Sequence, residues 1–329
     1  MSKIKAAVCH QFGAPLVIET VNLRPPKKGE VKVKLGAVAI CHSDISYAEG
    51  DWGGMLPAVY GHEAAGTITA LGDSTTGLLV GDRVIVTMIR ACGFCSKCGS
   101  GQPSLCEANY SREKGPISTL DGTMIEHGLN CGAFAESVVV DNSQVVKIPH
   151  DLEFASASLL ACGVITGIGA VVNSANLKAG QDAVVIGAGG VGLNAIQGAR
   201  ICGARRIVAI DMLKEKLEIA MEFGATDCVL ATEKAPWKIV KSLIGRGADA
   251  VFVTVGAATA YDSAPRYLAY GGKAIMVGMP KTGEKSNYEP VIMSAVGQSL
   301  IGSKMGDVVI KRDIPWMIDL YSQGRLKLD

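Results

Sequence analysis

The sequence lacks the features by which several classes of protein are recognised. Its 329 residues carry 32 basic and 31 acidic side chains, a net charge of +1, so electrostatics gives no reason to expect nucleic acid, an acidic partner or a membrane surface. No stretch approaches the roughly 20 apolar residues of a membrane span, and the amino terminus has no long apolar run typical of a signal peptide. Internal repeats are also absent. We therefore expect a soluble, cytoplasmic protein with a small, neutral substrate.

The strand-like and helix-like patterns divide the chain into two parts, as its length also suggests. Up to Pro149, short β-rich runs alternate with turns such as Gly81-Asp82, which predicts a mainly antiparallel β domain. Later apolar strands alternate with stretches of helical period, which predicts an α/β domain with a doubly wound parallel sheet. The strands expected there are 183–186, 206–210, 227–230, 250–253 and 274–277, and the helices are 191–202, 213–223 and 236–244. The polar stretch 107–131 has little periodicity, and we expect an ordered surface excursion there.

A glycine-rich turn opens the second part. Gly187, Gly189 and Gly192 follow an apolar strand and begin a helix, in the G-x-G-x-x-G pattern of dinucleotide-binding turns. There the first glycine makes the bend, the second lets the backbone approach a pyrophosphate, and the third lets helix and strand pack closely. Asp211 ends the next strand, where a carboxylate accepts both ribose hydroxyls and repels a 2′-phosphate, so NAD is favoured over NADP. The alternatives are that Asp211 caps the next helix, and that Lys216 is a solvated lysine rather than a second ribose contact.

Cysteine is used in a way that indicates metal binding. Cys92, Cys95, Cys98 and Cys106 stand at intervals of three, three and eight residues, and four thiolates so spaced form a closed tetrahedral Zn²⁺ site of the structural kind. In a long chain without a signal peptide, zinc is a better interpretation of the ten cysteines than a disulfide framework. Four others show no ligand spacing and are expected to be packed as small apolar side chains: Cys9, Cys131, Cys202 and Cys228.

A second, catalytic zinc needs about three protein ligands and an open position, and Cys41 and His62 are candidates for it. The third ligand must come from elsewhere, and Cys162, at the junction of the two parts, is the candidate. Two thiolates and a neutral imidazole leave the Zn²⁺ site near neutrality, so binding of an alkoxide is not opposed by excess negative charge. Asp44 and Glu63 are expected to orient a ligand or to exchange on and off the metal. A helix cap or a surface position is the alternative for either.

These motifs occur together in one known family. The chain resembles the zinc-containing medium-chain alcohol dehydrogenases over essentially its whole length, because it carries in their order Cys41-His42-Ser43-Asp44, Gly61-His62-Glu63, the four-cysteine lobe, Cys162 to Thr166, and Gly187 to Gly192 with Asp211. The resemblance implies a GroES-like catalytic domain over 1–163, with a zinc lobe at about 91–107, and a Rossmann NAD-binding domain over 164–304. We expect 305–329 to return towards the catalytic domain and to be truncated, because family chains continue further.

The resemblance also implies roles for single residues. It implies catalytic zinc on Cys41, His62 and Cys162 and structural zinc on the four lobe cysteines, so two zinc ions and NAD are the expected cofactors. It further implies that Ser43 takes the proton of the substrate hydroxyl, and we count Asp44 and Glu63, beside the metal ligands, with it as catalytic candidates. The positions implied for cofactor binding are His42, Thr166, Gly187, Gly189, Gly190, Val191, Gly192, Asp211, Lys216 and Val277. The positions that line the substrate channel, or else are ordinary core, are Trp52, Met88, Phe134 and Met279. Ser46 replaces the histidine that ends the proton relay in many members, so the relay runs through ribose hydroxyls and water or through Tyr47.

We therefore predict an enzyme that transfers hydride between a primary or secondary alcohol and NAD. The 107–131 excursion resembles that of the long-loop, dimeric branch of the family, so we expect a homodimer, with 299–302 as a candidate pairing edge. The alternatives on this scaffold are polyol, hydroxy-acid or glutathione-adduct (hydroxymethylglutathione) dehydrogenases, which need polar groups such as Arg112, Lys114 and Glu126. A non-catalytic, zinc-stabilised NAD-binding module and a zinc-free reductase are the remaining alternatives, and the complete set of metal ligands argues against both.

Overall fold

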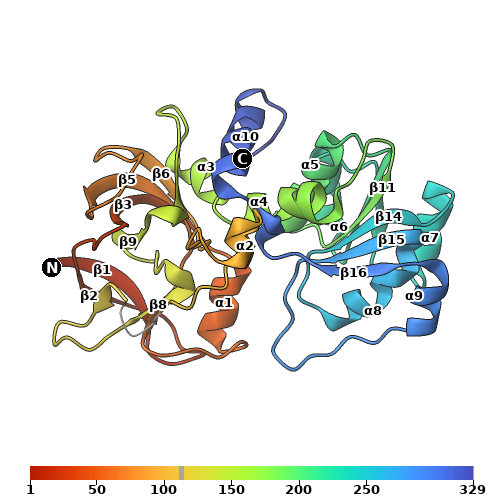
Figure 1. Ribbon diagram of the computed structural model, residues 1–329. Coiled ribbons are helices and arrows are strands. Elements are labelled where there is room, and N and C mark those ends of the chain that lie inside the picture. The colour runs from red at the N-terminus through yellow and green to blue at the C-terminus, as the bar shows by residue number, and fades with distance from the viewer. Residues whose placement is uncertain (111–114, 329) are drawn as a thin grey trace. The chain divides into compact units, whose positions relative to one another are not determined.

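The computed structural model describes residues 1–110 and 115–328, so Arg112 and Lys114 lie outside the described residues. The chain forms two compact units (Figure 1). The first comprises Met1–Cys162, Val309–Asp319 and Leu328, and the second comprises Gly163–Val308 and Leu320–Lys327. Among the described residues, no helix combines the length and the apolar character that crossing a membrane requires.

The first unit is built on two five-stranded sheets. The strand orders are β7-β2-β1-β4-β8 and β10-β6-β5-β3-β9, and most neighbours are antiparallel, as the sequence predicts. The strands are β1 (Ser2–Cys9), β2 (Val17–Leu23), β3 (Glu30–Ala39), β4 (Ala58–Val59), β5 (Glu63–Leu71), β6 (Arg83–Val86), β7 (Ile117–Ser118), β8 (Glu126–His127), β9 (Ser137–Asp141) and β10 (Val145–Lys147). The helices are α1 (His42–Glu49), α2 (Ser96–Gly99), α3 (Phe154–Leu159) and, in part, α10 (Ile310–Ser322). Alternate residues of β1, namely Ile4, Ala6 and Val8, face the core between the sheets.

The prediction that 107–131 forms a surface excursion was wrong for the middle of this stretch, which is partly buried. Ile117 and Ile125 are fully buried in the core of the first sheet. β7 pairs with β2, and β8 pairs with β4. Strands of two residues are too short to produce an alternating pattern, so the sequence gives no periodic signal for this packing.

The second unit is a parallel sheet covered by helices on both faces (Figure 1). Its six strands have the order β13-β12-β11-β14-β15-β16, and the sequence reversal between β11 and β14 is that of a doubly wound sheet. The strands are β11 (Asp182–Ile186), β12 (Arg206–Asp211), β13 (Asp227–Leu230), β14 (Ala248–Val253), β15 (Leu268–Met276) and β16 (Ser299–Gly302). The helices are α4 (Gly163–Gly169), α5 (Gly190–Ile201), α6 (Lys214–Glu222), α7 (Pro236–Ile244), α8 (Ala258–Tyr267) and α9 (Pro290–Val296). All five predicted strands and all three predicted helices are present; their ends agree within two residues, except that β15 begins six residues before the predicted strand.

Candidate active site and metal centres

Four potential metal ligands converge in the first unit. Cys41, His62, Glu63 and Cys162 each bring one ligand atom into a group in which all atoms lie within 4.8 Å of one another. Cys41 is the N-cap of α1, the His-Glu pair opens β5, and Cys162 follows α3. The turn before His62 requires glycine, because Gly61 has φ of 91° and a Cβ there would lie 2.6 Å from Phe134. Residues distant in sequence thus meet as the three expected ligands and one carboxylate.

Asp44 holds parts of this cluster in position through hydrogen bonds. Its buried carboxylate accepts the backbone N–H of Cys41 through Oδ2 and that of Gly61 through Oδ1, each at 3.0 Å. Oδ1 also lies 3.0 Å from His62 Nδ1, so Nδ1–H donates to Asp44 and Nε2 is the nitrogen left to bind a metal. Within the described residues, the buried Nε2 of His62 has no hydrogen-bond partner. A buried, unsatisfied nitrogen beside two thiols is what a metal ion would complete.

The electrostatics of the cluster also suit a metal. The hydrogen bond with Cys162 is the main cause that lowers the pKa of Cys41 to about 3, against the opposing effect of burial. Burial disfavours a protonated His62, but its interactions with the Asp44 carboxylate and the Cys41 thiolate outweigh burial and raise the pKa of His62 to about 10. The site therefore stabilises a positive charge next to a thiolate, and a zinc ion is a cation that can take the place of the proton on Nε2.

The four lobe cysteines form a second group of the same size. Their sulfur atoms lie within 4.8 Å of one another, with Cys92 to Cys98 and Cys95 to Cys106 at 4.0 Å. Four thiolates at about 2.3 Å from a tetrahedral zinc have sulfur atoms separated by about 3.8 Å. Backbone N–H groups of Cys92, Cys95 and Cys98 point at sulfur atoms of the same group, at 3.3–3.4 Å. The lobe is thus preorganised for a closed zinc site with no open position.

The remaining predicted residues of the first unit differ in their surroundings. Ser43 Oγ is 3.1 Å from Cys41 Sγ, whereas His42 is exposed. Tyr47 packs edge-on against Trp52 with ring centroids 5.1 Å apart and is stacked on Tyr60 at 5.9 Å. Of the remaining channel candidates of this unit, Met88 packs against the core of the second sheet, and Phe134 contacts Gly61. Both are therefore at least partly core residues.

The glycine-rich turn in the second unit has the geometry that its sequence predicts. Gly187 has φ of 101°, and a Cβ on Gly192 would lie 1.7 Å from the Gly187 carbonyl oxygen, so close packing excludes any side chain at this position. A Cβ on Gly189 or Gly190 would meet no atom of the chain within 4 Å. The turn is therefore packed on one side and open on the other, where backbone N–H groups at the start of α5 can receive a phosphate.

Asp211 fixes the position of this turn. Its Oδ2 accepts the N–H of Ala188 at 2.7 Å, and its Oδ1 accepts that of Leu213 at 3.1 Å, just before α6. Asp211 therefore contacts the start of α6, as a helix cap would, and also lies beside the glycine-rich turn, as a cofactor-binding residue would.

Sequence reasoning missed Thr254, whose hydroxyl donates to the carbonyl oxygens of Ile186 and Gly187 at 3.0 and 2.9 Å. Its place directly after β14, at the carboxyl edge of a parallel sheet, was the available signal.

The other residues of the second unit that were predicted to bind the cofactor or the substrate differ in their burial. Lys216 is exposed on α6, and Met279 is 63% exposed. Val191 is half-buried at the start of α5, and Val277 packs against the core of the sheet. Thr166 is buried on α4, with its hydroxyl 3.8 Å from Met305 Sδ.

A GroES-like unit with two cysteine-rich metal centres and a Rossmann unit with a dinucleotide-binding turn define a zinc-dependent dehydrogenase. Residues 27–150 match the model of the alcohol dehydrogenase GroES-like domain, and residues 190–323 match that of the zinc-binding dehydrogenases. The chain belongs to the zinc-containing medium-chain alcohol dehydrogenase family. It is an oxidoreductase that interconverts alcohols and carbonyl compounds, with zinc and a nicotinamide dinucleotide as cofactors.

Individual relatives cover nearly the whole chain. An S-(hydroxymethyl)glutathione dehydrogenase of Synechocystis sp. is 33% identical over 99% of this chain and 91% of its own length. The class-P alcohol dehydrogenase of Arabidopsis thaliana is 33% identical over 99% of this chain and 89% of its own. The crystal structure of benzyl alcohol dehydrogenase from Acinetobacter calcoaceticus has a TM-score of 0.94 and 30% identity, over 100% of this chain and 91% of that one.

The open side of the glycine-rich turn yields a direct prediction about cofactor binding. Gly189 has φ of −84° and ψ of −171°, which alanine adopts without strain, so Gly189→Ala is expected to leave the thermal unfolding midpoint within a few degrees of wild type. Its methyl group would occupy the space where a pyrophosphate approaches, and we expect NAD to bind roughly tenfold more weakly. Titration of NAD by calorimetry, beside a melting curve, measures both. Gly99→Ala, at a glycine of the first unit that is equally open and outside the left-handed region, is the control for glycine replacement, and equal NAD affinity in Gly189→Ala and wild type would contradict the prediction.

Proposed function

We propose that Cys41, His62 and Cys162 hold the catalytic zinc and that the four lobe cysteines hold a structural zinc. The observation that carries the first assignment is the unsatisfied, buried Nε2 of His62, which points away from Asp44 and belongs to the same group as the two sulfur atoms. Glu63 supplies a carboxylate to this group, which suits a ligand that exchanges as substrate enters.

The chain's own residues then handle the substrate proton. When bound, zinc supplies Lewis acidity that lowers the pKa of an alcohol hydroxyl, and NAD accepts the hydride. Ser43 Oγ, 3.1 Å from Cys41 Sγ, is placed to take the hydroxyl proton and to pass it on. The proton then passes through the ribose hydroxyls of the cofactor and water, or through Tyr47 on the same helix, because Ser46 has no titrating imidazole.

We infer that NAD rather than NADP is the natural cofactor. The Asp211 carboxylate lies at the end of β12 and is fixed by two backbone N–H groups. A carboxylate at this place accepts ribose hydroxyls and repels a 2′-phosphate.

We propose apolar and aromatic alcohols as the preferred substrates. The support is the apolar ring of Trp52, which packs against Tyr47, and the likeness to a benzyl alcohol dehydrogenase. The second candidate is S-(hydroxymethyl)glutathione, which the name of the Synechocystis relative supports. Glu126 does not favour that anionic substrate, because its own charge is negative.

Zinc analysis combined with a substrate panel tests this proposal. We expect two zinc ions per chain, one for each ligand group, and NAD reduction with a kcat/KM for benzyl alcohol well above that for ethanol, a polyol or S-(hydroxymethyl)glutathione. A preference for the glutathione adduct would identify the second candidate. One zinc and no turnover with any alcohol would contradict the proposed function and favour a binding module.

We also propose that the chain works as a cytoplasmic homodimer. β16 is an edge strand of the six-stranded sheet, so its outer backbone groups are available for pairing across a two-fold axis. All ten cysteines are free thiols, and zinc-thiolate sites suit a reducing compartment.

A further inference from the structure

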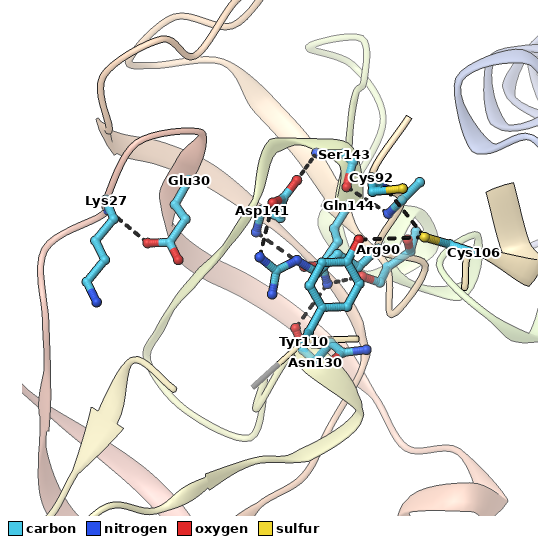
Figure 2. A network of polar contacts seen from close by, with 12 residues as sticks. Lys27, Glu30, Arg90, Cys92, Cys106, Tyr110, Asn130, Asp141, Ser143 and Gln144 are labelled. Atoms are coloured by element: carbon cyan, nitrogen blue, oxygen red, sulfur yellow. Dashed lines mark hydrogen bonds and ion pairs between the residues drawn. The ribbon is translucent and has the colours of Figure 1, made fainter. Parts of the chain in front are cut away.

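A tyrosine and an arginine lie beside the zinc lobe, and the spacing of the cysteines does not predict either of them. Tyr110 follows the lobe, and its phenolic oxygen lies 3.7 Å from Cys106 Sγ (Figure 2). The guanidinium of Arg90, which precedes the lobe, lies over the ring of Tyr110 at 3.9 Å from its centroid. Tyr110 therefore contacts Cys106, and Arg90, from the other end of the lobe segment, contacts Tyr110.

Arg90 is itself held by the sheet beneath. Its Nη2 lies 3.3 Å from the carboxylate of Asp141, at the end of β9. The same turn holds the next residue of the chain, because the backbone N–H of Ala91 donates to Ser143 Oγ at 3.0 Å. Asp141 is fixed in turn by the N–H of Ser143 at 3.0 Å (Figure 2). A continuous series of contacts thus runs from β9 through Arg90 and Tyr110 to Cys106.

The direction of the last contact follows from zinc chemistry. A zinc-bound cysteine is a thiolate and can only accept, so the phenol of Tyr110 must be the donor. A zinc ion with four thiolates carries a net charge of −2, and a hydrogen bond to one sulfur draws electron density from it. The guanidinium of Arg90 polarises the phenol through the face of its ring and makes its O–H a stronger donor. Both effects make Cys106 less reactive towards acids, chelators and electrophiles.

We propose that Tyr110 and Arg90 form a clasp that keeps zinc in the lobe and protects the Cys106 thiolate. This inference rests on the proposed zinc site of the four cysteines. It assigns positioning roles to two residues that are neither metal ligands nor part of the catalytic cluster.

Tyr110→Phe tests the clasp, because it removes one oxygen and keeps the ring on which Arg90 stacks. We expect release of the lobe zinc to a chromogenic chelator to be roughly tenfold faster than in wild type, as for other residues that hydrogen-bond metal ligands. Alkylation by iodoacetamide, mapped by mass spectrometry, should rise first at Cys106 and only later at Cys92, Cys95 and Cys98. Tyr270→Phe, at a tyrosine that is 85% exposed in the second unit, is the matched control and should behave as wild type.

A second variant and the pattern of alkylation distinguish the clasp from a general loss of folding. Arg90→Lys keeps a charge near Asp141 but loses the planar stacking group, so its zinc release should fall between those of wild type and Tyr110→Phe. A general loss of folding would lower the melting temperature and raise alkylation equally at all four cysteines, and such uniform exposure would overturn the clasp. Equal release rates in wild type, Tyr110→Phe and Arg90→Lys would overturn it too. Lobe cysteines that react as free thiols in zinc-loaded wild type would instead contradict the zinc site itself.

Discussion

Replacement of Cys41 by alanine is expected to lower kcat/KM for alcohol oxidation by at least roughly a thousandfold. The Lewis acidity of a metal contributes several kcal/mol to the reaction, and each 1.4 kcal/mol or so corresponds to a factor of ten in rate. The variant loses one of the two sulfur ligands that meet His62, and its zinc content should fall by one ion while the lobe keeps its own. Steady-state kinetics with NAD and elemental analysis of the same sample measure both effects.

Cys202→Ala is the matched control for this loss. Cys202 is a half-buried thiol at the end of α5 that belongs to neither ligand group, and its replacement should leave zinc content and kcat/KM close to wild type. A Cys41→Ala protein that retains two zinc ions and near-normal turnover would show that the catalytic metal is held elsewhere. Loss of both ions would instead indicate that the first unit unfolds, which a melting curve would reveal.

Local spacing made the lobe and the glycine-rich turn predictable from sequence. Cys92, Cys95 and Cys98 need only a short loop to converge, so their intervals alone specify the group. The turn at Gly187 is similarly local, because a buried strand and a helix flank it directly. Cys162, by contrast, is 100 residues beyond His62, and it became a candidate zinc ligand only because the other motifs occur in the same chain. The structure brings its sulfur into the group through the fold of the whole first unit.

The separate roles of Asp44 and Glu63 were not predictable from sequence. Each stands next to a metal ligand, so either could orient His62 or approach the metal. The outcome depends on α1, because Cys41 is its N-cap and Asp44 occupies the third helical position, where the side chain folds back to the cap N–H. That geometry also directs the carboxylate at Gly61 and His62. The helix is short and weakly amphipathic, so its start could not be read from a hydrophobic pattern.

Asp44→Asn is expected to lower kcat/KM by roughly 10- to 100-fold and to weaken zinc binding at the catalytic cluster by a similar factor. The carboxylate accepts on both oxygens, from Cys41 on one side and from Gly61 and His62 on the other. An amide has one accepting oxygen, so its NH₂ group must face an N–H donor on one of the two sides. Either arrangement leaves a buried donor unsatisfied and releases Cys41 or His62 from its position.

Kinetics at saturating zinc separate the two consequences of this change. Weak binding alone would be rescued by added zinc, whereas a misplaced imidazole would leave kcat low at full occupancy, and we expect only partial rescue. Asp73→Asn, at an exposed carboxylate of the same unit, is the control for the loss of one negative charge and should match wild type. Full activity of Asp44→Asn without added zinc would show that the acceptor at Cys41, Gly61 and His62 is dispensable, and that the metal ligands are held by the fold alone.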